Sequence, residues 1–235
     1  MKYLKDYNDY NDDLIVEKLN LQPLIDKFKK SINKKVVADL LIGGLLTVLT
    51  ISQTMNYINK NFEEDEKKVL IEVVSKFSDP LSMSLSDSAV TNIKKHEGLK
   101  LKAYKIGDGK ITVGYGHAES IGKSAFRVGQ VISERIAEEL LRKDLKDAED
   151  GIKRMFTQWR EEGVDIKVTQ GQFDALVSMT YNMGISGLRN TTFIDTLKSG
   201  KFEDAAELIK TTKINDDKFP GLRDRRMTEY SMFTS

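Results

Sequence analysis

The chain has 235 residues, a formal net charge of +1 and no cysteine. That length allows one or two domains with a substantial core, and 31% charged with 40% hydrophobic residues indicates a globular rather than a disordered protein. The near-zero charge gives no case for nucleic-acid binding, and the missing cysteines exclude disulfides and thiolate metal sites. Because there are only two histidines as well, we expect no metal-ligand cluster.

Residues 1–35 are charged and of mixed composition. A secretory signal needs basic residues followed directly by an apolar run, and this start has none, so we expect no such signal here. Residues 19–32 have the pattern of a short amphipathic helix.

The most apolar segment is residues 36–59. The 20 residues from 40 to 59 carry no charge, which is enough length to span a bilayer. Polar amides in the second half confine the strongly apolar part to residues 40–51. Three interpretations stay open: a helix packed within the protein or an oligomer, a membrane-associated segment, or an element that docks on a virion partner.

An acidic run at residues 63–66 is followed by apolar residues at helical spacing, which predicts another helix. The sequence SDPLSMSLSDS at 78–88 contains a proline and many serines, and it predicts a linker. We therefore place a domain boundary near residue 84. Residues 1–84 form a predicted helical extension, and residues 85–235 form a second domain.

Residues 95–120, KHEGLKLKAYKIGDGKITVGYGHAES, predict a helix end followed by a β-hairpin. Apolar and polar residues alternate on both sides of a Gly-Asp-Gly turn, whose residues tolerate the positive φ that tight turns need. Such a hairpin would hold Asp108 and Thr112 near the end of the helix that carries Glu97. Two carboxylates and a hydroxyl that face one cleft suit glycoside hydrolysis, in which one carboxylic acid protonates the leaving oxygen.

The remainder of the second domain has helical patterns with recognisable caps. We expect helices that begin near Asp87, Ser133 and Thr169, and a last helix with Pro220 in its first turn. With the hairpin, these helices predict a mostly helical α+β domain. Three cations of the last helix are expected to form salt bridges: Arg223, Arg225 and Arg226.

The hairpin segment resembles the active-site hairpin of the phage-type lysozymes, glycoside hydrolase family 24. Five residues are in register with the pattern of that family: Glu97, Thr112, Gly114, Gly116 and His117. The second catalytic position of the family holds Ile106 here, and the nearest carboxylate, Asp108, lies two residues later. Hairpin geometry can absorb such a shift, or Asp108 is a turn residue only, and both interpretations stay open.

Two further segments are similar to helical-lobe segments of phage endolysins in order and spacing: QGQFDALVSMTYNMGISGLRNTTF at 170–193 and FPGLRDRRMTEY at 219–230. The resemblance covers residues 88–233, and residues 1–85 have no counterpart in it. It implies an α+β fold in which a small hairpin lobe and a larger helical lobe surround a cleft.

The resemblance also implies a phage or prophage muramidase. This enzyme would hydrolyse the β-1,4 bond between N-acetylmuramic acid and N-acetylglucosamine in the peptidoglycan of the host periplasm, without a cofactor. Glu97 would be the general acid, and this role calls for an apolar, partly buried carboxyl. Asp108 and Thr112 would direct water at the sugar carbon, and a separation of roughly 6.5–9.5 Å between the two carboxyls would imply inversion. The matching histidine, His117, is structural in the family.

Several residues keep two interpretations. Two tyrosines either line the cleft or brace it: Tyr104 and Tyr115. Three polar residues either contact sugar or peptide or serve as surface caps: Gln170, Asn182 and Arg189.

Two further hypotheses concern the whole chain. Residues 1–84 would meet a membrane or virion partner if they locate the enzyme. Because Ile106 stands at the aspartate position, the alternative function is a virion structural protein whose lysozyme-like domain binds glycan with little or no activity.

Overall fold

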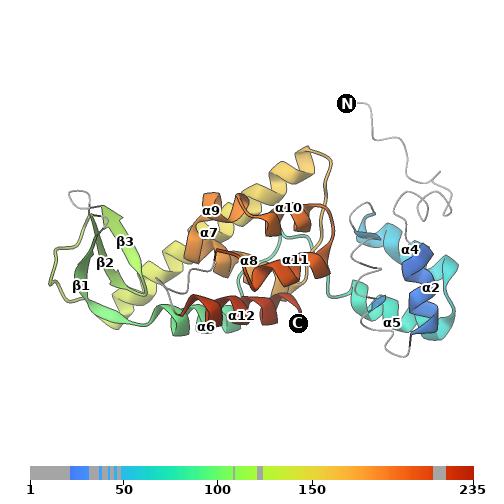
Figure 1. The fold of residues 1–235 in the computed structure, drawn as a ribbon, viewed down its shortest axis with the longest axis horizontal. Helices are drawn as coiled ribbons and strands as arrows, with labels where there is room; N and C mark the ends of the chain where they lie inside the picture. The colour runs from blue at the N-terminus through green and yellow to red at the C-terminus, as the bar shows by residue number, and fades with distance from the viewer. Residues whose placement is uncertain are drawn as a thin grey trace.

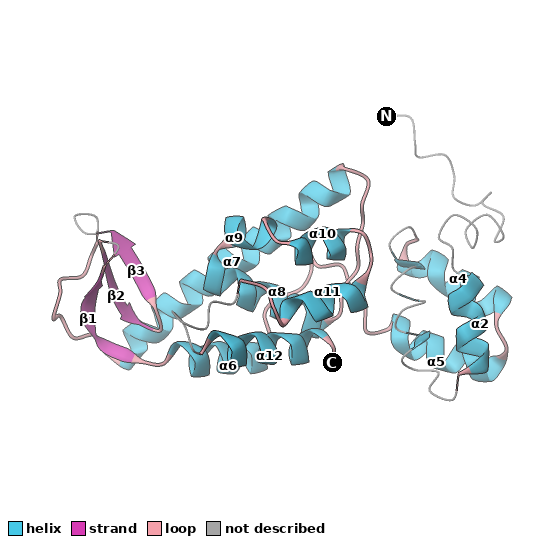
Figure 2. Cartoon of the chain, viewed as in Figure 1, coloured by secondary structure: helices cyan, strands magenta, loops and turns pink. Residues whose placement is uncertain are grey.

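The computed structural model describes residues 22–31, 37–38, 42, 45–46, 49–107, 109–120, 124–213 and 221–235, and all structural statements below concern these residues. They form a group of N-terminal helices, a small three-stranded sheet and a larger helical lobe (Figure 1 and Figure 2). The predicted fold class, α+β with mostly helices, is confirmed.

The N-terminal helices have a core of their own. α2 (Gln22–Lys30), α4 (Ile51–Asn61) and α5 (Glu64–Val74) share one cluster of buried apolar side chains. α4 begins at a capping box, because Thr50 and Gln53 each accept a hydrogen bond from the other's backbone N–H. The cluster includes Phe28, Ile42, Leu45, Leu46, Ile58 and Leu70.

The apolar segment 36–59 is described in part. Its second half is most of α4, and the described residues before Thr50 are all buried: Val37, Ala38, Ile42, Leu45, Leu46 and Leu49. Within the described ranges, no helix has both the length and the apolar character needed to cross a bilayer. The remaining residues of the segment lie outside the described part of the chain.

The segment predicted as a linker is packed against the helical lobe. Ser78 forms an isolated antiparallel bridge with Val168, and Met83 is 7% exposed within the main core of the lobe. The backbone N–H of Leu85 donates to Glu149 over 3.0 Å. The prediction of a linker at 78–88 is therefore wrong, because its apolar side chains are seated on the lobe.

The sheet consists of β1 (Lys100–Ile106), β2 (Lys110–Gly114) and β3 (His117–Ser120), antiparallel and in that order. The first two strands form the predicted hairpin, and β3 adds a third strand that the sequence pattern did not predict. The free edge of β1 is bonded by the chain that follows β3. The backbone of Ala103 exchanges hydrogen bonds with residues 129 and 130, and Ile132 donates to the Leu101 carbonyl.

Among the described residues, seven helices build the larger lobe: α6 (Asp87–Glu97), α7 (Glu134–Glu161), α8 (Gln170–Met183), α9 (Ile185–Arg189), α10 (Thr192–Lys198), α11 (Phe202–Ile209) and α12 (Leu222–Phe233). α7 begins beside the sheet and continues into this lobe (Figure 1), so one helix belongs to both lobes. α8 is central, with nine consecutive buried residues from Gln172 to Thr180.

The helix starts agree with the predicted caps at two of three positions. Ser133 and Thr169 cap α7 and α8 through their hydroxyl oxygens. α6 is capped by Ser86 rather than by the predicted Asp87, which is the first residue of the helix. Pro220, predicted in the first turn of the last helix, lies outside the described residues.

Candidate active site

Glu97 is the last residue of α6, and the chain leaves the helix at Gly98, whose φ of +67° is free of strain only for glycine. The Glu97 side chain is 21% exposed. Nη1 of Arg225 donates to Oε1 of Glu97 over 2.5 Å. The expected partial burial is confirmed, whereas the expectation of apolar surroundings is wrong because a guanidinium lies against the carboxylate.

On its other side, Glu97 faces the turn between β2 and β3. Gly116 in this turn has a φ of +95°, and a Cβ on it would lie 3.2 Å from Oε2 of Glu97. The Tyr181 hydroxyl fixes the turn to α8 by donating to the Tyr115 carbonyl over 2.7 Å. Burial, assisted by the charge of Glu97, raises the pKa of Tyr181 above its usual value. The hairpin thus approaches one oxygen of Glu97, while Arg225 holds the other.

Thr112 lies in β2, paired with Tyr104 on β1 and with Ala118 on β3. It is 2% exposed, and its hydroxyl has no hydrogen-bond partner in the described part of the chain. A buried polar group left without a partner costs about 1–3 kcal/mol. Because the hydroxyl is inaccessible to solvent, a role of Thr112 in orienting water stays a prediction.

Asp108, the predicted second carboxylate, lies outside the described residues, so its distance from Glu97 stays a prediction. The turn around it is the predicted hairpin turn, because Ile106 pairs with Lys110 and the Gly109 N–H donates to the Ile106 carbonyl. Ile106 is 41% exposed. The position that holds aspartate in the family pattern therefore carries an exposed aliphatic side chain at the end of β1.

His117 joins β3 to α7. Its Nδ1 lies 2.8 Å from a carboxylate oxygen of Asp144, and its Nε2 lies 3.2 Å from Oε1 of Glu119. The hydrogen bond with Asp144 raises the pKa of His117, although partial burial opposes the shift. This arrangement between two elements fits the structural role that the resemblance implies.

The two tyrosines predicted to line or brace the cleft lie in different surroundings. Tyr104 is one wall residue of an open groove along β1, which residues 100–105 form with Val128 and Gly129. Tyr115 lies between lobes instead: the Lys94 ammonium is 5.4 Å from its ring centroid, and its hydroxyl donates to Glu138 of α7 over 3.4 Å. Neither Glu97 nor Thr112 lines this groove, so contact of Tyr104 with the catalytic cleft stays a prediction, whereas the contacts of Tyr115 fit a bracing position.

The three polar residues of the helical lobe do not gather around Glu97. Gln170 bonds to the Ser84 carbonyl and to Asp174, and it precedes Tyr181 by roughly 16 Å along α8. Two others have partners within the lobe: Asn182 accepts from Arg226 over 2.6 Å, and Arg189 donates to Gln158 over 3.0 Å. These contacts favour the surface and capping interpretation of all three.

The sequence did not predict two contacts at the site, that of Arg225 with Glu97 and that of Tyr181 with the Tyr115 carbonyl. Salt bridges of Arg225 and Arg226 were expected and are confirmed. The spacing of Arg225 and Glu229 indicates a helical ion pair, but no sequence pattern connects Arg225 with Glu97, 128 residues away. Across the described residues, no three histidines and acidic residues lie close enough to hold a metal ion.

A glutamate at a helix end, a three-stranded hairpin lobe beside it, and a long helix that joins this lobe to a helical one define a two-lobed lysozyme fold. A family model described as phage lysozyme matches residues 94–229. The chain belongs to the phage lysozyme family.

Relatives with known names agree with this assignment. The chain is 38% identical over 154 residues to the endolysin of Bacillus phage B103. This match covers 64% of this chain but only 54% of that protein. It is 32% identical to the endolysin of Acyrthosiphon pisum secondary endosymbiont phage 1, of which it covers 99%. Among solved structures, the muramidase domain of SpmX from Asticaccaulis excentricus matches with a TM-score of 0.53 at 28% identity, over 65% of this chain and 98% of that one.

Proposed function

We propose that the chain is a phage-encoded peptidoglycan hydrolase, a muramidase that cleaves the β-1,4 bond between N-acetylmuramic acid and N-acetylglucosamine. The observation that carries the proposal is Glu97, which stands at the family's acid position, partly buried, with one oxygen turned toward Gly116 of the hairpin lobe. The endolysin and muramidase names of its relatives support the substrate.

Glu97 acts as the general acid. Arg225 occupies Oε1, so the proton that goes to the glycosidic oxygen is carried by Oε2, the oxygen near Gly116. Protonation of the glycosidic oxygen lets its bond to the sugar carbon break without expelling an alkoxide. General acid catalysis of this kind typically contributes about 10²–10⁴-fold in rate.

Water completes the reaction from the opposite face of the sugar. Thr112, which is in register with the threonine of the family pattern, orients this water through its hydroxyl. Asp108 takes the proton from the water as the new bond to carbon forms. The product then has the inverted configuration at that carbon.

The principal test measures the clearing of purified sacculi by wild type, Glu97→Gln and Glu139→Gln. Glu139 lies on the surface of α7, 59% exposed, and controls for the chemical change itself. We expect Glu97→Gln to lose at least 100-fold in rate and Glu139→Gln to keep it. An undiminished rate for Glu97→Gln would remove this residue from the mechanism.

The second carboxylate is tested separately. Asp108→Asn should lose activity by a comparable factor, and Ile106→Asp should not compensate for that loss if Asp108 directs the water. A near-normal rate for Asp108→Asn assigns it to the turn alone. NMR of the fresh product distinguishes inversion from retention at the sugar carbon.

The alternative, a virion protein that only binds glycan, rests on Ile106 alone, and the relatives named above are endolysins or a muramidase rather than structural proteins.

We also propose that residues 1–84 locate the enzyme, on a membrane or on a virion partner. Their own apolar cluster supports a folded docking unit, and we keep the proposed domain boundary near residue 84. Membrane fractionation of the full chain against a truncation that begins at Ser75, which keeps the packed junction, tests this. Equal solubility and equal activity on whole cells would refute a locating role.

A further inference from the structure

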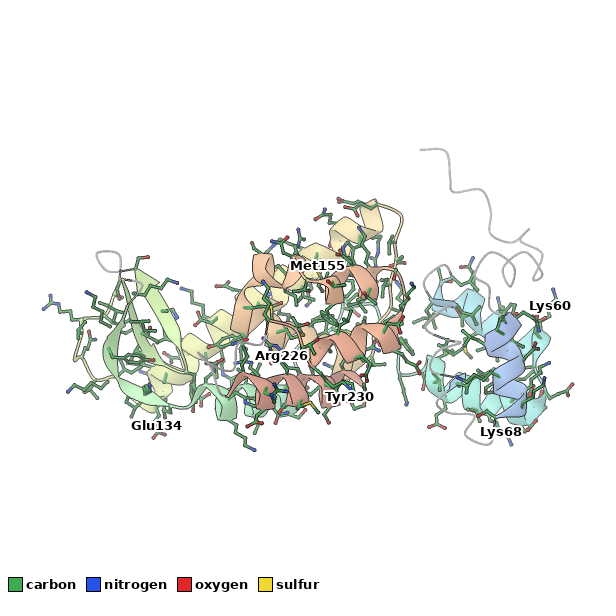
Figure 3. The ribbon with its side chains drawn as sticks, in the orientation of Figure 1. Lys60, Lys68, Glu134, Met155, Arg226 and Tyr230 are labelled. Carbon is green, nitrogen blue, oxygen red and sulfur yellow. The ribbon has the colours of Figure 1, made fainter. Side chains whose placement is uncertain are left out.

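Glu97 is one end of a chain of four charged groups that continues into the protein. The other three lie on α12 and are buried: the side chains of Arg225, Arg226 and Glu229 are 5%, 1% and 1% exposed. Figure 3 shows Arg226 within the helical lobe. Charged side chains are rarely buried to this extent unless their partners balance them.

Hydrogen bonds connect the four charged groups in the order Glu97, Arg225, Glu229 and Arg226. Arg225 donates to Glu97 through Nη1, to Oε1 of Glu229 through Nε over 3.1 Å, and to the Ser178 carbonyl through Nη2. Glu229 also accepts from the Ser178 hydroxyl over 2.8 Å and from Nη1 of Arg226.

Arg226 closes the cluster on the other side. Its Nε donates to the Thr212 carbonyl over 3.0 Å, and its Nη2 donates to Asn182 over 2.6 Å. Every nitrogen of both guanidinium groups therefore has a partner, and each group keeps one orientation.

The charges of this cluster sum to zero only when Glu97 is ionised. A general acid must instead be protonated, and in that state two guanidinium groups face one carboxylate. A guanidinium in contact with a carboxyl favours its ionised form. Arg225 alone would therefore work against the acid, and the carboxylate of Glu229 offsets it.

We propose that Glu229 is a positioning residue that holds Arg225 against Oε1 of Glu97 and balances its charge, so that Oε2 of Glu97 stays available to carry the transferred proton. Arg226 also donates to Glu229, so the positive charge of Arg226 weakens the balance that Glu229 provides for Arg225. The inference rests on the proposed function, in which Glu97 is the general acid. It explains why Glu229 carries a charge, which packing alone does not.

Few other charged groups surround Glu97. On α6, Lys95 is exposed, Lys94 forms an ion pair with Glu138 of α7, and burial, with the charge of Arg225, lowers the pKa of His96. On α8, Tyr181 stays neutral because burial raises its pKa. On α7, Asp144 is engaged by His117, and the hairpin brings only the backbone of its turn. Arg225 is thus the cation in direct contact with Glu97, and Glu229 is a carboxylate paired with that cation.

The test uses paired variants in the full-length protein, with the pH dependence of kcat/KM on sacculi as the first readout. Glu229→Gln leaves Arg225 less balanced, so the fall in activity at high pH should move to lower pH by about one unit. Arg226→Met removes a cation, so this high-pH limb of the profile, where activity falls, should move to higher pH. The double variant restores the charge sum and should return toward wild type.

A role in packing alone predicts a different pattern, in which both single variants lose activity at every pH and the limb stays in place. That pattern in folded variants, confirmed by thermal melts, overturns the proposal. Glu162→Gln, which removes a carboxylate from an exposed ion pair with Lys198, is the control and should leave the limb unchanged. If Glu229→Gln fails to fold, the shift of Arg226→Met to higher pH and the return of the double variant toward wild type still decide.

A second readout separates this inference from the proposed function. The carboxyl carbon of Glu97 can be titrated by NMR in the same variants without substrate. Opposite shifts of its titration midpoint support the charge balance even if wild type proves inactive on sacculi. Unchanged midpoints in an active enzyme refute the role of Glu229 and leave the muramidase assignment intact.

Discussion

Gly116→Ala is the sharpest test of how the hairpin meets the acid. The φ of +95° at this position puts an L-residue in a left-handed conformation, which costs about 1–2 kcal/mol. For a chain of this size, that corresponds to a fall in Tm of roughly 2–8 °C. The new Cβ would also lie 3.2 Å from Oε2 of Glu97, so the carboxyl must give way by a few tenths of an ångström.

The effect on rate follows from this displacement. Since a misplacement of about 1 Å can cost about 100-fold, a few tenths predict a loss on the order of 3–10-fold in kcat. Gly163→Ala is the matched control, because its φ is +87° and no atom lies within 4 Å of its Cβ position. It should lose similar stability and keep its kcat.

The assay combines thermal unfolding with initial rates on purified sacculi at a temperature where both variants are fully folded. If the two variants lose equal stability and both keep the wild-type kcat, Oε2 of Glu97 does not carry the transferred proton. The geometric reasoning about Gly116 would then fail.

Two other predictions concern the hairpin lobe. The hydrogen bond with Asp144 raises the pKa of His117, so its contribution is fully present below about pH 6.5 and is lost as pH rises through the folded-state value. Asp144→Asn should therefore reduce stability by about 1.5–3 kcal/mol at pH 5 and by much less at pH 9, and equal losses in melts at the two pH values would contradict this. Thr112→Val removes a buried hydroxyl with no partner in the described residues while keeping the shape, so the melt should show equal or higher stability and the sacculus assay a lower kcat. An unchanged kcat would exclude Thr112 from orienting water.

The hairpin and the position of Glu97 were predictable because both depend on local signals. A Gly-Asp-Gly turn between alternating strands and a glycine after the glutamate leave few backbone options. β3 was missed because its four residues, His-Ala-Glu-Ser, show no clear alternation, and they pair only because β2 offers an edge.

The junction before α6 shows a signal that was present but misinterpreted. In LSMSLS at 81–86 the apolar residues alternate with serines, and Met83 is buried while Ser82 and Ser84 are exposed. Serine and proline content predicted a linker, whereas the period of two predicted a segment with one face on a core.

The surroundings of Glu97 could not be obtained from sequence for a different reason. Its contact with Arg225 depends on how α12 packs against α8 and α6, which is tertiary structure. The expectation of apolar surroundings followed from the chemistry of an isolated acid, and the fold supplies instead a cation together with its balancing carboxylate.

The backbone cover on β1 has a consequence for the protein in concentrated solution. An open strand edge is a template on which a second molecule can add its own strand, and growth by such additions leads to aggregates. In this sheet the residues after β3 already saturate the middle of the β1 edge, and the opposite edge is a strand of four residues. Intermolecular strand addition is therefore restricted on both sides of the lobe.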